Sequence, residues 1–352
     1  MFRDKPVEIR TAPHLKRPQS VDEIMRNVVY ALVPIAAFSI LQFGISSLAL
    51  IVTTTLVAMG TERLFAHLSG KGNTLRDWSV VITGILLALT LPPGFPLWMA
   101  AVAAFVAVAL GKALFGGLGH NVMNPALVGR AFVQAAFPVA ITTWTPAFAP
   151  GRFSEFIPST LTAPFMKPEP VAQWVAGLQI DGFTGATPLA MQKFQHIYVS
   201  TTDLFFGGVT GSSGEAPAIL IIIGGLFLAV RRMLDWRIPV GVFVGAAVVA
   251  TPLWLFDSIS YPSPMFVWFS GGLMLGAWFM ASDMIASPVT PLGAFLYGGL
   301  IGVLTVIIRQ FGGLAEGVMY AILLANAASP LIASLTQPRV YGGRGRGRER
   351  GT

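Results

Sequence analysis

Long apolar runs dominate this chain and restrict it to folds whose backbone polar groups are satisfied inside a membrane. The first run, residues 27–68, is too long for one span, because roughly 20 residues cross a bilayer. It is interrupted at Gln42, Phe43 and Gly44 and therefore predicts a helical hairpin. Charged residues make up 11% of the 352 positions, against about 25% in soluble domains. The sequence indicates an all-α polytopic membrane protein.

Eight further apolar segments bring the expected number of transmembrane helices to about ten. One of them, residues 78–91, is shorter than a bilayer requires and stops at the proline-rich stretch 92–96. It predicts a broken segment that neighbouring helices shield from lipid. The other segments are residues 97–114, 126–141, 218–234, 238–256, 265–280, 292–308 and 317–335.

The ten segments form two sets of five with interruptions at matching places. Each third segment ends in prolines, at 92–93 and at Pro288, and each fifth segment carries a polar residue before proline, at 124–125 and 329–330. Because five is odd, the second set would enter the membrane inverted relative to the first. We therefore expect two inverted five-helix repeats with broken helices, residues 27–141 and 217–336, and a site at their interface.

The positive charges predict the orientation of the chain. Lys and Arg collect in an N-terminal arm (1–26), at the ends of apolar runs and in a basic, low-complexity tail (337–352). By the positive-inside rule both termini are cytoplasmic and the hydrophilic region 142–216 is periplasmic, in a bacterial inner membrane. The pattern argues for a lipid membrane and against a nucleic-acid partner. This arrangement leaves four of the 23 basic residues outside: Arg152, Lys167, Lys193 and Arg309.

The chain has no cysteine, which excludes disulfides, thiolate metal sites and iron–sulfur clusters held by this chain. An electron carrier in this chain would therefore be organic, such as a flavin. The histidines lack the paired helical spacing of a haem bundle; they are His14, His67, His120 and His196.

One stretch of the hydrophilic region, residues 181–188, consists of small and polar residues. Its glycines, threonines and proline predict a loop that presents the Thr187 hydroxyl on flexible backbone. The plainer interpretation is a turn, or a helix cap formed by Thr187 before Pro188. The stretch includes Asp181, Thr184, Gly185, Ala186 and Thr187.

These residues match the pattern D-x-x-[S/T]-G-A-T, with Thr184 at the position that is usually Ser. The stretch resembles the acceptor site of the RnfD/NqrB family, at which a flavin transferase joins FMN to threonine through a phosphoester. Small residues beside the acceptor leave room for the modifying enzyme. The resemblance implies covalent FMN on Thr187.

Two other turns resemble the same family. Residues 211–217 form a turn that leads into an apolar run, and Pro217 suits an early position of a helix. The turn would therefore lie at a helix N-terminus, which favours an anion such as the flavin phosphate. Residues 121–125 form an asparagine-containing turn. The family implies a second, non-covalent flavin, riboflavin, for which Asn121 and Asn124 are candidates; a helix-capping role is the alternative. In the first turn the candidate phosphate ligands are Gly211, Ser212, Gly214 and Glu215.

The resemblance covers essentially the whole chain, and the short N-terminal arm favours its RnfD branch over NqrB. It implies an electron-transfer subunit, not catalytic alone, of an Na⁺- or H⁺-translocating ferredoxin:NAD⁺ oxidoreductase. Its partners would be subunits carrying iron–sulfur clusters and flavin. Three alternatives stay open: an NqrB-type subunit of a Na⁺-translocating NADH:quinone reductase, a solute channel or transporter, and a purely structural subunit. The second is open because inverted repeats with broken helices also build channels.

Ionisable residues in apolar surroundings are candidates for the ion path. Arg130, inside the fifth segment, could neutralise a reduced flavin or mark the cytoplasmic interface. Asp283, flanked by Ser282 and Ser287, is the best candidate ion ligand among the acids near membrane depth. These acids are Glu62, Asp77, Asp235, Asp257, Asp283 and Glu316.

Overall fold

The computed structural model describes residues 20–70, 72, 74–177, 185–215 and 217–338, and these residues form helices and loops without a strand. Five helices are long and apolar enough to cross a membrane. The all-helical, polytopic membrane protein predicted from the sequence is therefore confirmed. The five are α1 (Val21–Phe43), α2 (Ile45–Leu68), α11 (Arg237–Phe256), α14 (Pro291–Phe311) and α15 (Val318–Leu335).

The first two helices form the predicted hairpin, with the corner at Gly44. Its φ of 74° suits glycine, and a Cβ there would lie 1.8 Å from the Arg152 carbonyl oxygen. Ile45 N donates to that oxygen at 2.9 Å, so the hydrophilic region is tied to the corner. Helix α1 begins at Val21, capped by Ser20, which is earlier than the predicted end of the arm at 26.

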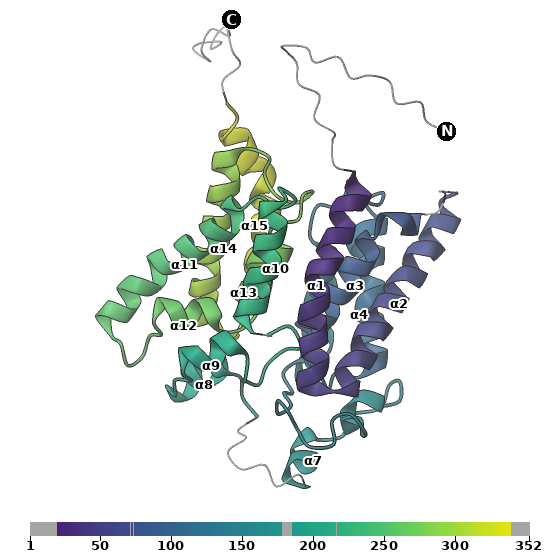
Figure 1. Ribbon diagram of the computed structural model, residues 1–352, viewed down its shortest axis with the longest axis vertical. Coiled ribbons are helices and arrows are strands. Elements are labelled where there is room, and N and C mark those ends of the chain that lie inside the picture. Colours follow the sequence, from purple (N-terminus) through teal and green to yellow (C-terminus); the bar gives the residue numbers. More distant parts are fainter. Residues whose placement is uncertain (1–19, 71, 73, 178–184, 216, 339–352) are drawn as a thin grey trace, which may run out of the picture.

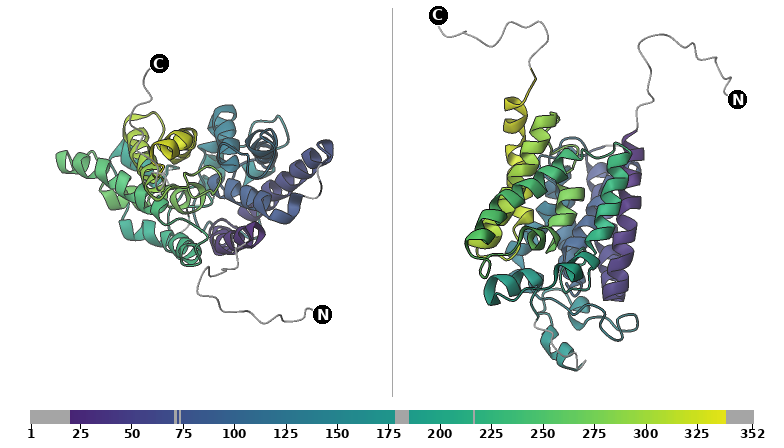
Figure 2. Two further views of the ribbon diagram at one scale, coloured as in Figure 1. Left: turned by 90° about the horizontal axis from the view of Figure 1, so that it is seen from above. Right: turned by 60° about the vertical axis from the view of Figure 1, so that its left-hand side comes forward.

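Shorter helices complete the bundle (Figure 1). The first group contains α1, α2, α3 (Ser79–Thr90), α4 (Leu97–Val108) with its π-helical extension η2 (Ala109–Ala113), and α5 (Pro125–Ala136). The second contains α10 (Ala218–Val230), α11, α14 and α15. Seen from one end, the two groups lie side by side (Figure 2). They meet where α1 packs on α10 and α5 packs on α15.

The segment 265–280 is interrupted inside its apolar run, and not only at the proline-containing end where the sequence predicted a break. It is divided into α12 (Pro264–Phe269), α13 (Leu273–Leu275) and the π-helical turn η4 (Gly276–Met280). The chain bends at residues 270–272, where Gly271 has φ 63°. The bend frees backbone carbonyl groups, and Arg309 of α14 donates to Val267 O and Ser270 O at 2.9 and 3.0 Å.

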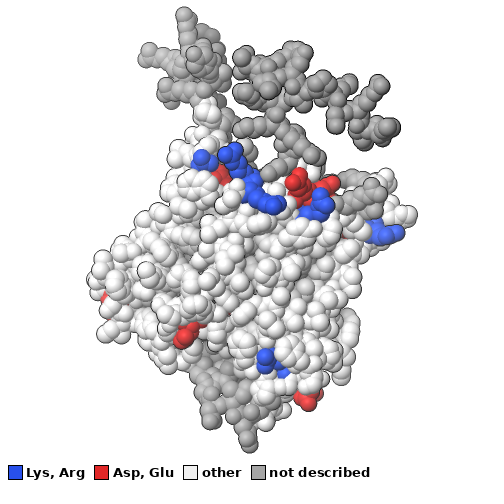
Figure 3. All heavy atoms as spheres, in the orientation of Figure 1, with Lys and Arg blue, Asp and Glu red and all other residues white. Residues whose placement is uncertain are grey.

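The hydrophilic region forms short helices at one end of the bundle, opposite the α1 N-terminus and the α15 C-terminus (Figure 1). Basic side chains gather near the end that holds those termini, and the middle of the visible face is almost free of charge (Figure 3). This distribution suits a membrane-embedded belt. The short helices are η3 (Pro158–Leu161), α7 (Val171–Gly177), α8 (Pro188–Gln195) and α9 (Thr201–Phe206), and α6 (Pro138–Ile141) directly precedes the region.

Helices α11 and α14 approach so closely that glycines form their interface. A Cβ on Gly302 would lie 2.1 Å from Val242 O, and one on Gly245 would lie 2.2 Å from Gly299 O. Small residues at such crossings let two backbones pack directly. This packing holds helices together inside a membrane, where the hydrophobic effect does not drive their association.

We expect Gly302→Ala to destabilise the protein by about 1–3 kcal/mol, because the added methyl group overpacks a backbone contact. Gly299→Ala is the matched control: it lies on the same helix, and its Cβ would meet nothing closer than 3.9 Å. Thermal unfolding of the purified protein in detergent measures both. Equal melting temperatures for the two variants would contradict the close packing.

Candidate functional site

Thr187 is the N-cap of α8. Its hydroxyl oxygen accepts a hydrogen bond from Ala190 N at 3.2 Å, Pro188 occupies the first turn, and the residue is 6% exposed. The predicted placement on flexible backbone was wrong, and the plainer interpretation as a helix cap is confirmed. The cap places the hydroxyl at the positive end of the helix dipole, beside amides that have no partner within the helix.

A cavity of about 290 Å³ opens beside Thr187, which we call the Thr187 cavity. Gly185 and Ala186 line it together with Thr187; Asp181 and Thr184 lie outside the described residues. The volume is close to the lower end of the range for ligand pockets, roughly 300 Å³. Its aromatic wall is formed by Trp144, Phe194 and Tyr320, and its charged floor by Arg130, Glu215 and Glu316.

The connection between α14 and α15 forms one wall of this cavity, through residues 313–316. Lys193 of α8 donates to Leu314 O at 3.0 Å and also bonds to Gly312 O. This contact holds the helix that carries Thr187 against the wall. Lys193 was predicted to lie outside the membrane, and partial burial lowers the pKa of its amine.

The charged residues of the cavity floor belong to a charge cluster, which we define as Arg130, Glu215, Glu316 and the neighbouring Arg309. Arg130 Nη2 lies 2.9 Å from Glu316 Oε2, and Gly272 N donates to Glu316 Oε1 at 2.6 Å. Arg130, Glu215 and Arg309 are buried, with Arg309 only 2% exposed. The sequence placed Arg309 among the external basic residues. It is enclosed by the protein instead, because it binds the carbonyls of the bend at 270–272.

The turn 211–215 packs against the end of α3. Ser213 N donates to Leu91 O at 3.0 Å and Gly214 N to Leu89 O at 2.6 Å, while Ser212 Oγ donates to Glu215 Oε1 at 2.9 Å. A Cβ on Gly214 would lie 2.6 Å from Leu89 O, which explains the glycine. Glu215 lines the Thr187 cavity, but the Ser213 and Gly214 amides donate to carbonyl groups at the end of α3. The phosphate contact predicted for Gly211, Ser212 and Gly214 is therefore less well supported than one at the N-terminus of α8.

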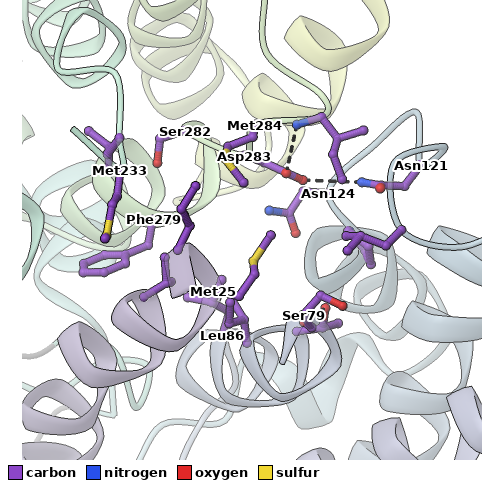
Figure 4. Close-up of a pocket in the computed structure, with 18 of the residues that line it drawn as sticks. Met25, Ser79, Leu86, Asn121, Asn124, Met233, Phe279, Ser282, Asp283 and Met284 are labelled. Atoms are coloured by element: carbon purple, nitrogen blue, oxygen red, sulfur yellow. Dashed lines mark hydrogen bonds between the residues drawn. The ribbon is translucent and has the colours of Figure 1, made fainter. Parts of the chain in front are cut away.

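A second cavity, of about 90 Å³, lies between the two groups of helices (Figure 4). Asn121, Asn124 and Asp283 meet on one side of it, and Met25, Leu86 and Phe279 form part of its apolar wall. We call it the interface cavity. The two asparagines predicted to bind a second flavin thus lie at one cavity.

Both asparagines also have structural contacts. Asn124 Oδ1 caps α5 by accepting from Ala126 N at 3.0 Å, and its Nδ2 donates to Met280 O at 3.2 Å. The helix-capping alternative is therefore confirmed for Asn124. Asn121 Nδ2 donates to Asp283 Oδ2 at 3.4 Å. Among the residues that the structure describes, no cluster of three metal-ligating side chains surrounds Asp283 or any other acid.

Sequence reasoning missed Lys112. Its amine is buried in η2 and donates to both Glu62 carboxylate oxygens at 2.8 Å and to Ser79 Oγ at 2.7 Å. Lys112 lines both the interface cavity and a third cavity of about 390 Å³ on the side of η1 (Thr74–Asp77). A lysine inside an apolar run was the available signal, and the π-helical turn that carries it is a common feature of functional sites.

Comparison with known proteins agrees with this architecture. The chain is 37% identical over 350 residues to the D subunit of the proton-translocating ferredoxin:NAD(+) oxidoreductase complex of Clostridium ljungdahlii, covering 96% of each chain. It is 38% identical over 338 residues to the D subunit of the Na(+)-translocating complex of Acetobacterium woodii, covering 95% of each. The D subunit of an ion-translocating oxidoreductase complex of Alcanivorax borkumensis is 36% identical over 341 residues, covering 94% of this chain and 96% of that one.

The sequence profile of one family matches nearly the whole chain, residues 8–342. With full-length relatives above 30% identity, this match confirms the resemblance inferred from the flavin-acceptor motif. The protein belongs to the NQR2, RnfD, RnfE family.

Proposed function

We propose that this protein is the D-type membrane subunit of an ion-translocating ferredoxin:NAD⁺ oxidoreductase and carries electrons on an FMN joined to Thr187. Its full-length relatives bear names of this kind. The observation that carries the flavin proposal is the position of the Thr187 hydroxyl, at a helix N-terminus and on the wall of a cavity of about 290 Å³. Those names include both proton and sodium translocation, so the proposal covers ion coupling without choosing the ion.

The helix end suits the phosphate of the linkage. A phosphoester on Thr187 Oγ1 adds negative charge beside the first amides of α8, where the dipole and the unpaired donors stabilise an anion. Pro188 supplies no N–H at the first position, so Leu189 and Ala190 offer the first amides. These amides would thus donate to the phosphate oxygens in place of the Thr187 hydroxyl oxygen.

The cavity suits the ring system. Trp144, Phe194 and Tyr320 offer aromatic surface to a planar ligand, and the charge cluster lies beneath. The bound flavin would supply the one- and two-electron chemistry. The chain would fix its position by the covalent tether, exclude bulk water with the aromatic wall and set the local potential through Arg130, Glu215 and Glu316.

The interface cavity is the proposed site of the second, non-covalent flavin. Its wall is mostly apolar, and Asn121 presents an amide and Ser282 a hydroxyl to a polar ring edge. Asn124 takes part through its position at the α5 N-terminus, since its own amide caps that helix.

Ten spans in two inverted repeats are also part of the proposal. In the first group α2 packs on α4 and α4 on α5; in the second α11 packs on α14 and α14 on α15, so matching helices make matching contacts. The broken segment α12–η4 counts as the third of the second group. Between the groups, the two first helices pack together, α1 on α10, and so do the two fifth helices, α5 on α15. A two-fold pseudo-axis produces such pairs, and broken helices at that axis are typical of inverted repeats.

Substitution of Thr187 tests the linkage. Thr187→Asn keeps a good helix cap but has no hydroxyl to esterify, so we expect a folded protein without covalent flavin. The readout is ultraviolet fluorescence of the denatured band on a gel, from cells that contain the flavin transferase. Thr202→Ala, an exposed threonine on α9, should stay fluorescent. A non-fluorescent wild-type band would reject the flavin and favour the channel alternative; full complex activity in Thr187→Asn would favour a structural subunit.

The second flavin has a separate readout. We expect Asn121→Leu to lose the flavin that acid extracts from the native protein while it keeps the fluorescent covalent band, because the substitution removes the polar group that faces a ring edge. His120→Leu, an exposed neighbour, is the control. Unchanged extractable flavin in Asn121→Leu would contradict this assignment.

The absence of native cysteine allows a clean test of orientation. Ser154→Cys, exposed in the hydrophilic region, should react with a membrane-impermeant maleimide on intact spheroplasts, because we place this region outside. Ser69→Cys, exposed at the end of α2, should react only after the membrane is opened. The reverse labelling pattern would invert the topology.

A further inference from the structure

The charge cluster beneath the Thr187 cavity contains two cations and two anions. Arg130 and Arg309 bring guanidinium groups from α5 and α14, and Glu215 and Glu316 bring carboxyl groups from two connecting loops. With all four ionised, their charges cancel. An electron added to a group in the cavity would break this balance by one unit, in a buried place where charge is poorly screened.

The two carboxyl groups differ in their support. Glu316 accepts hydrogen bonds from Arg130 and from Gly272 N, so its charge is matched by a cation and a backbone dipole. Glu215 accepts a hydrogen bond from the Ser212 hydroxyl and is 9% exposed. Its carboxylate lies near Glu316, which repels it, and near Arg130, which attracts it more weakly. Of the two, Glu215 is the group whose charge costs more to maintain.

The surroundings of the cluster have room for about one internal water molecule. A small cavity of about 10 Å³ adjoins Arg130, Ser212 and Glu316. Among the described residues, four buried polar atoms of the cluster and its neighbours have no hydrogen-bond partner in the protein: Arg130 Nε, Ser213 Oγ, Ser270 Oγ and Arg309 Nε. Such groups are usually satisfied by internal water, which conducts protons between polar groups.

We propose that Glu215 is a redox-linked proton site, which binds one proton when the group in the Thr187 cavity gains an electron and releases it when the electron leaves. This inference rests on the proposed covalent flavin. The electron comes from the oxidoreductase complex, and the proton comes from water on the side to which the cavity opens. The Glu215 carboxylate becomes a neutral carboxyl group, and no bond to the flavin forms or breaks.

The surroundings favour Glu215 over other groups for this change. Among the described residues, Arg130, Arg309 and Glu316 are the charged groups that face it, and Tyr320 is the remaining ionisable side chain on the cavity wall. Arg309 binds two backbone carbonyls and Glu316 binds a backbone amide, so a change of their charge would disturb the bend at 270–272. The hydrogen bonds of the Glu215 carboxylate come from Ser212 in its own turn, so its charge can change without disturbing that bend.

The experiment compares redox titrations of the covalent flavin in the complete, purified complex, with dithionite as reductant, at several pH values. Flavins bind protons themselves, so the measured quantity is the difference between the wild type and Glu215→Gln. We expect the equilibrium constant for one-electron reduction of the flavin to change up to tenfold more per pH unit in the wild type than in the variant. This difference corresponds to about 59 mV in the reduction potential per pH unit. Glu155→Gln, an exposed acid in the hydrophilic region, should match the wild type.

A second measurement does not depend on the folding of a variant. Redox difference infrared spectra of the wild type should show the carbonyl stretch of a newly protonated carboxyl group on reduction, and it should disappear in Glu215→Gln. Equal pH dependence in the wild type and Glu215→Gln, or no carboxyl signal in the wild type, would overturn the inference while the flavin is present. Absence of the covalent flavin itself would instead reject the proposed function.

Discussion

Every backbone group inside a membrane needs a partner in the protein, and the broken helices of this chain meet that requirement with one another. The bend at 270–272 exposes carbonyls and an amide; Arg309 binds the carbonyls and Glu316 binds the Gly272 amide. The end of α3 exposes Leu89 O and Leu91 O, which receive amides of the turn 213–214. The packing around the broken segments depends on these contacts, because without them the segments would have unpaired backbone groups inside the bundle.

The same contacts explain why the Thr187 cavity lies where it does. The partners of the broken segments come from the α14–α15 connection and from the turn before α10, which are distant in sequence. Bringing them together beside α5 creates a space that helical packing does not fill, with the residues that satisfy the backbone as its floor. Thr187 then reaches this space from α8, which Lys193 fastens to the α14–α15 connection.

Local patterns in the sequence predicted what local chemistry determines. The hairpin corner at Gly44, the early end of α3 and the helix cap at Thr187 each depend on a few adjacent residues. The bend at 270–272 was not predicted, because glycine within an apolar run is compatible with a membrane helix and the bend is stabilised by Arg309, which lies far along the chain. The Lys112–Glu62 pair was missed for the same reason, since its partners lie on different helices.

The identity of the charged residues also separates structural from functional roles within the cluster. A guanidinium group stays ionised and presents several donors in a fixed plane, so Arg309 can bind two carbonyls at once and still act as a cation. A lysine could not reproduce this geometry. Glu316 is held in the same way, by the Arg130 cation and a backbone amide. These three residues therefore give the cavity floor a fixed charge. Glu215, whose carboxylate is bonded to Ser212 in its own turn and not to the bend, remains the member whose charge can follow that of a cofactor above it.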